Sequence, residues 1–116
     1  MNAGTRSCIA YIAGRLISGG SSNHVYDFSR SKHVSFSGSV DAQQVNIYDH
    51  DRGCHFGGAP SSLYDFGRGN HVRIEVNGSQ FNGYDFGAGH HFRGTVQGSN
   101  ISLYDFGDSK HYNFSL

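Results

Sequence analysis

The residues with the greatest chemical potential in this chain belong to one motif that recurs five times. Tyrosine is followed by aspartate each time, and a histidine follows each tyrosine after seven residues. The five pairs are Tyr26 and His33, Tyr48 and His55, Tyr64 and His71, Tyr84 and His91, and Tyr104 and His111. Phenols, carboxylates and imidazoles serve acid–base catalysis, metal coordination and ligand binding. A fivefold repeat is typical of a structural ladder, whereas an active site is one asymmetric constellation. We therefore expect a protein that is not an enzyme.

Metal binding by the histidines is the next chemistry to weigh, because the chain has eight of them. In an array of hairpins, successive motif histidines lie two strands apart, about 9–10 Å. One ion holds its nitrogen ligands at about 2.1 Å, so two such histidines cannot share it. We expect no metal and no cofactor. Metal binding by histidine stays a second alternative, since histidines on adjacent coils of a solenoid could share an ion.

Ligand binding is the chemistry that these rings favour most. Phenylalanine follows the Tyr-Asp pair in four of the five motifs, and His50 takes its place in the other. Flat rings with polar tips suit sugars, and repetition suits a polymer with a repeating unit. We predict a non-catalytic module that binds an extended or repetitive, carbohydrate-like ligand through a face of tyrosine, histidine and phenylalanine, with all ten tyrosines and histidines of the motif as the site residues. The alternative is a structural protein that assembles through the edges or faces of its sheet.

Composition narrows the class of partner. Nine Lys and Arg residues balance nine Asp and Glu residues, so the net charge is zero. A neutral protein has no overall attraction for the phosphates of a nucleic acid, and no nucleic-acid partner is expected. No apolar run is long enough for a membrane span, and no membrane partner is expected. We expect a homo-oligomer, and the localisation stays unknown because no clear signal peptide precedes Arg15. Cys8 and Cys54 are either two free thiols or a single bridge.

The spacing of the motif predicts the elements that position it. Successive tyrosines are 22, 16, 20 and 20 residues apart, and residues between them alternate apolar and polar. We predict an all-β fold with tandem hairpin repeats of about 20 residues, forming an antiparallel meander of about 10–12 short strands. The alternative is a β-solenoid with one repeat per coil. The chain is read as one domain, 1–116, with five repeats over 22–116. Residues 1–21 are expected to form one or two divergent capping strands, and no helix is expected.

Register and turns follow from the same spacing. Even changes in repeat length keep every side chain on its face. Two-residue turns would place Tyr84 level with both His71 and His91, in one row across the sheet. The opposite face carries an aliphatic row that we expect to be the dry core: Val25, Val34, Ile47, Phe56, Leu63, Val72, Gly83, Phe92, Leu103 and Tyr112.

The turn that follows each Tyr-Asp pair gives three further expectations. Gly67, Gly87 and Gly107 should have positive φ, as the first residues of type II′ turns. Phe66 and Phe86 should lie opposite glycines. Three cross-strand pairs should form between Asp27 and Lys32, Asp85 and His90, and Asp105 and Lys110.

Overall fold

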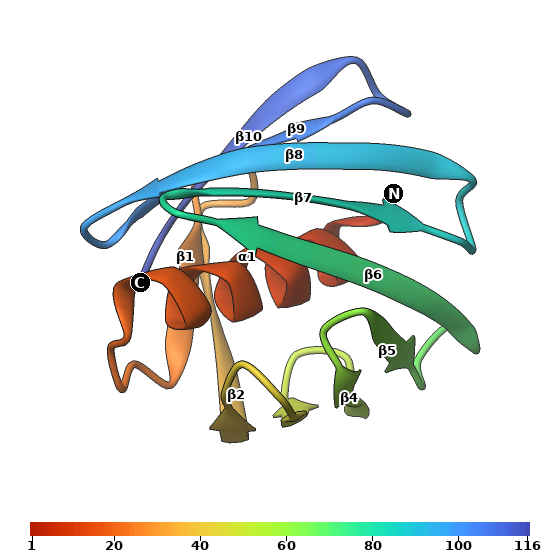
Figure 1. The fold of residues 1–116 in the computed structure, drawn as a ribbon, viewed down its shortest axis with the longest axis horizontal. Coiled ribbons are helices and arrows are strands. Elements are labelled where there is room, and N and C mark those ends of the chain that lie inside the picture. The colour runs from red at the N-terminus through yellow and green to blue at the C-terminus, as the bar shows by residue number, and fades with distance from the viewer.

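The computed structural model describes all residues 1–116, which form a closed antiparallel barrel of ten strands around one helix (Figure 1). The elements in chain order are α1 (Ala3–Ser18), β1 (His24–Asp27), β2 (Lys32–Val40), β3 (Val45–Asp49), β4 (Cys54–Ala59), β5 (Ser62–Asp65), β6 (Asn70–Asn77), β7 (Gln80–Asp85), β8 (His90–Gln97), β9 (Asn100–Asp105) and β10 (Lys110–Ser115). Each strand pairs with its chain neighbours, and β1 pairs with β10 to close the barrel. The predicted meander is confirmed, and the solenoid alternative is wrong.

The N-terminal segment is the main error of the sequence prediction. Residues 3–18 form α1 rather than capping strands, and α1 occupies the lumen of the barrel (Figure 1). Its residues from Thr5 to Gly14 are all buried. A helix enclosed on every side has no polar face, so the 3.6-residue alternation that reveals most helices is absent. Asn2 caps its first turn by accepting a hydrogen bond from the N–H of Thr5, and Gly19 ends it in the left-handed conformation (φ 67°).

The lumen is narrow, and the helix sequence fits it with small residues. A Cβ at Gly14 would lie 2.7 Å from the Cδ1 of Ile101, so this position has no room for a side chain. The largest side chain of the buried part of α1, Tyr11, stacks on the ring of Phe36 with the ring centroids 4.3 Å apart.

The two faces of the sheet are as the alternation predicts. All ten members of the aliphatic row are buried and point toward α1, which confirms the dry core. The motif tyrosines lie on the outer surface and are partly exposed, and the motif histidines beside them are exposed. Gaps of even length therefore do preserve the side to which each residue points.

The register between repeats differs from the expected level row. Across the loop that follows each Tyr-Asp pair, the tyrosine does oppose its histidine, as Tyr84 opposes His91. On its other side Tyr84 opposes Arg73, two residues beyond the predicted His71. Every repeat is offset in this sense, by two residues or by four. A barrel closes only when its strands tilt, and tilted strands require such a stagger, whereas a level row describes a flat, open sheet.

The turns also differ from the expectation. The Tyr-Asp pair leads into a loop of four residues, so Phe66 and Phe86 lie in loops and not opposite glycines. Positive φ falls at the fourth loop residue, for example Gly89 (73°) and Ser109 (54°), and not at Gly67, Gly87 or Gly107. The N–H of Gly89 donates to the carbonyl of Asp85 at 2.8 Å, a five-residue turn that a two-residue hairpin lacks.

Candidate functional site

The outer surface carries five aromatic clusters at one end of the barrel, which we call the aromatic rim. Each cluster is a motif tyrosine, the ring two residues later and the motif histidine. The clusters are Tyr26–Phe28–His33, Tyr48–His50–His55, Tyr64–Phe66–His71, Tyr84–Phe86–His91 and Tyr104–Phe106–His111. In every cluster the tyrosine meets both partners edge to face, with centroids 4.7–5.0 Å apart. All ten predicted site residues are therefore brought together, in five pairs rather than one row.

The loop phenylalanines belong to the predicted aromatic face, but none of them was named among the predicted site residues. Phe28, Phe66, Phe86 and Phe106 are 46–62% exposed, and they are four of the five large hydrophobic side chains exposed on the molecule. Their fixed place two residues after each motif tyrosine was the available signal, because each ring packs on that tyrosine. Exposed rings of this number need an explanation in the function.

Each loop of the rim is held by the aspartate that precedes it. The Oδ1 atom of this aspartate accepts a hydrogen bond from the backbone N–H two residues later, at 2.8–3.0 Å in all five repeats. This local bond fixes the start of the loop and the place of the ring between. Gly67 is needed here for space, because a Cβ would lie 2.7 Å from the Sγ of Cys54.

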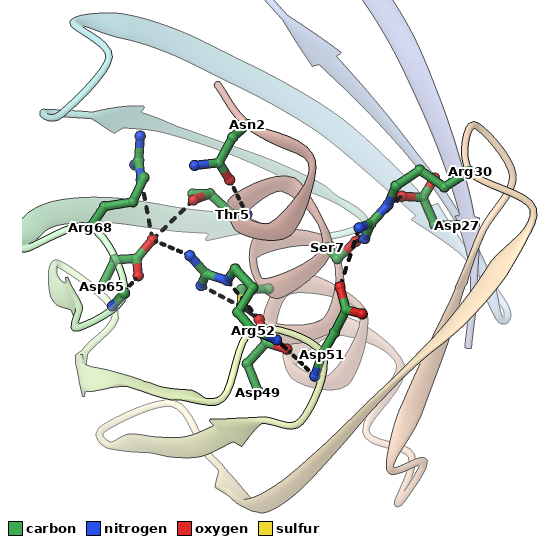
Figure 2. A network of polar contacts seen from close by, with 12 residues as sticks. Asn2, Thr5, Ser7, Asp27, Arg30, Asp49, Asp51, Arg52, Asp65 and Arg68 are labelled. Atoms are coloured by element: carbon green, nitrogen blue, oxygen red, sulfur yellow. Dashed lines mark hydrogen bonds and ion pairs between the residues drawn. The ribbon is translucent and has the colours of Figure 1, made fainter.

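The same five aspartates point into the end of the barrel and are at most 1% exposed. Figure 2 shows how Arg52 lies between Asp49 and Asp65 beside the first turn of α1. Asp65 also accepts from the Oγ1 of Thr5 at 2.9 Å and pairs with Arg68 at 3.3 Å. Loop, strand and helix therefore meet at Asp65.

The protonation of these carboxylates is set by their partners. Burial alone would raise the pKa of Asp65, but the hydrogen bond and charge of Arg52 and the hydroxyl of Thr5 outweigh burial, so its pKa lies below the ordinary value. The pKa of Asp27 is lowered in the same way, since hydrogen bonds from Ser29 and Arg30 outweigh burial. Both carboxylates therefore stay ionised at neutral pH.

The three predicted cross-strand pairs are correct in register, but their side chains form no ion pair or hydrogen bond with each other. Asp27, Asp85 and Asp105 do oppose Lys32, His90 and Lys110 in the register. The carboxylates turn inward instead. Asp27 pairs with Arg30 at 2.7 Å, Asp85 with Arg68 at 2.7 Å, and Asp105 with the amino group of Met1 at 3.3 Å. A buried charge needs a partner that is buried with it, and these cations are less exposed than the strand-end lysines.

Neither the cysteines nor the histidines form a reactive cluster. Cys8 and Cys54 are two free thiols and form no disulfide bridge. Burial raises the pKa of the Cys8 thiol well above its ordinary value. No group of three or more His, Cys, Asp or Glu side chains is arranged to hold a metal ion. The one helix is not long and apolar enough to cross a membrane.

Grooves separate neighbouring clusters of the rim. One lies between the second and third clusters, where Gly57 and Gly58 leave the strand without side chains. It has a volume of about 470 Å³ and is bordered by His55, Tyr64 and Phe66. Such a groove offers ring faces and edges at its sides and backbone at its floor, which are the surfaces that a flat, hydroxylated ligand contacts.

Comparison with known proteins identifies no relative of this chain. No protein-family profile, curated protein or solved structure is significantly similar to this chain.

Proposed function

We propose that this protein is a non-catalytic module that binds extended carbohydrates through its aromatic rim. The single observation that carries the proposal is the outward Tyr–ring–His cluster, repeated five times with the same edge-to-face geometry. The barrel core needs none of these rings, because α1 and the aliphatic row fill the interior. Their exposure therefore calls for a partner.

The chemistry of each cluster suits a sugar. The phenylalanine ring offers an apolar face to the C–H groups of a pyranose, and the tyrosine hydroxyl and imidazole nitrogens offer hydrogen bonds to its hydroxyls. The buried aspartate below fixes the loop before any ligand arrives, so little order has to be gained on binding.

The shape of the rim determines how a polymer would bind. The molecule measures 30 × 29 × 28 Å, and its clusters point outward in different directions around the barrel. A stiff chain can touch neighbouring clusters on one side only, which leaves the others free. We therefore expect one protein molecule to bind more than one polymer chain and to cross-link them.

A second candidate function is self-association through the same rim, favoured by the four exposed phenylalanine rings. The closed barrel has no free edge strand, so the edge pairing that the sequence suggested has no template in this fold. Contact between the rims of two copies is the form of assembly that fits.

The test is a binding titration with unbranched neutral oligosaccharides, comparing wild type, Phe86→Ala and Val76→Ala. Val76 is the matched control, because it is an exposed apolar residue (42%) outside the rim. We expect Phe86→Ala to weaken binding roughly fivefold, the loss of one ring contact of about 1 kcal/mol, and Val76→Ala to have no effect. Equal affinities of the three proteins would contradict the proposal. Light scattering tests the second candidate, which requires a mass that grows with concentration and shrinks in Phe86→Ala.

A further inference from the structure

One pocket on the outer face differs in chemistry from the rest of the rim. It lies over β7, β8 and β9, with one further lining residue each from β6 and β10, and it has a volume of about 400 Å³. Most of its lining is polar, and the side chains that matter here are Asn82, Arg93, Thr95, Ser102, Tyr104 and His111. They come from two adjacent rows of the sheet, since Arg93 opposes both Asn82 and Tyr104, and Thr95 opposes Ser102.

Arg93 is the single Lys or Arg of this pocket, and no Asp or Glu lines it. The guanidinium lies 5.6 Å from the ring centroid of Phe106 and forms no ion pair. This is unlike Arg30, Arg52 and Arg68, which are each committed to a buried aspartate. Arg93 is thus an exposed cation with free donors, held over an aromatic face.

The neighbouring repeat shows that this arrangement is specific. Arg73 occupies the same place in the unit before, opposite Tyr84. It is half-buried, its Nε is buried without a hydrogen-bond partner, and it does not line this pocket. Glu75, the nearest acidic residue in the row, lies two strands from Arg93 and outside the pocket.

We propose that this pocket binds a carboxylate-bearing sugar, a uronic acid unit of an extended chain. The planar fork of Arg93 matches the two oxygens of a carboxylate. The ring of Tyr104 provides the platform at the edge of the pocket, and Asn82, Thr95 and Ser102 provide hydrogen bonds to hydroxyls. The inference rests on the proposed function, because it names the ligand class for one part of the same rim.

The test uses three uronic acid hexasaccharides, containing glucuronate, galacturonate or guluronate, each compared with its carboxyl-reduced, neutral counterpart. Affinities are measured by calorimetry for wild type, Arg93→Gln and Arg73→Gln, the matched control that removes the same charge one repeat away. We expect wild type to prefer at least one acidic form about tenfold over its reduced form. Arg93→Gln should abolish this preference and keep the affinity for the neutral form, and Arg73→Gln should change neither.

The outcomes separate the two proposals. Equal binding of acidic and neutral forms by wild type overturns the uronic acid pocket and leaves the carbohydrate module standing. A loss of preference in Arg73→Gln as large as that in Arg93→Gln also overturns the pocket, because general charge would then explain it. Binding of neither form by wild type overturns both proposals.

Discussion

Replacing Asp65 by asparagine tests whether the buried carboxylates hold the barrel and its helix together. The substitution keeps the shape and an oxygen that can accept from the N–H of Gly67, 2.9 Å away in the wild type. It removes the charge that faces Arg52 at 3.1 Å and Arg68 at 3.3 Å. It also replaces the Oδ2 atom, which accepts from the hydroxyl of Thr5, with an NH2 group that can only donate. Asp65 is 0% exposed, so water cannot replace the lost partner.

The size of the loss in stability depends on which ion pairs Arg52 and Arg68 keep in the variant. Breaking a buried ion pair costs about 3–5 kcal/mol when the remaining charge has no other partner. Here Arg52 still has Asp49 at 2.8 Å and Arg68 still has Asp85 at 2.7 Å. We therefore expect the lower end, about 3 kcal/mol, which corresponds to a fall in melting temperature of roughly 10 °C or more.

The control is an aspartate that also bridges two cations but lies at the surface. Asp51 pairs with Arg30 and Lys32, and its side chain is 22% exposed. Asp51→Asn should cost at most about 1 kcal/mol. Both variants are measured by urea unfolding with far-ultraviolet circular dichroism. A cost for Asp65→Asn below about 1 kcal/mol, or equal to that of Asp51→Asn, would refute the reasoning.

Three further expectations follow from the fold. Leu103→Ala should lower the free energy of unfolding by about 2–4 kcal/mol, because Leu103 is 0% exposed. An unchanged midpoint of urea unfolding would contradict the assignment of Leu103 to the core. Gly89→Ser, which copies Ser109 of the last repeat, should cost about 1 kcal/mol, since Gly89 has a φ of 73°. The lowered pKa values of Asp27 and Asp65 mean that the stability they contribute is constant above about pH 4 and is lost as the pH falls below it. Thermal melts between pH 7 and pH 2.5 check this, and a melting temperature that does not fall below pH 4 would contradict it.

The sequence was sufficient to predict the strands, their antiparallel order and the face to which each side chain points. These features depend on local alternation and on even spacing between motifs, and both can be read directly from the sequence. It was insufficient for the stagger between repeats. Whether Tyr84 meets His71 or Arg73 depends on closing the barrel with β1 and β10, a constraint that no single hairpin contains.

The helix was missed for a related reason. The segment from Cys8 to Ala13 is an unbroken apolar run, which fits a buried strand as well as a helix enclosed in a barrel. The aspartates had a signal that was available and unused. Asp27 is two residues from Val25 in one strand, so it shares the buried face, and an arginine follows three residues later in three of the five repeats.

The buried aspartate explains how the rim can vary while the barrel stays intact. One of its oxygens holds the loop that carries the exposed ring, and the other faces the lumen, where it meets α1 or an arginine. The exposed ring itself contributes to neither contact. The second repeat illustrates this separation: His50 replaces phenylalanine, yet it still packs on Tyr48 at 5.0 Å, and Asp49 still holds its loop at 2.9 Å. A change of the exposed ring, or of the exposed Arg93, therefore leaves in place the contacts of the buried aspartate that hold the loop and the helix.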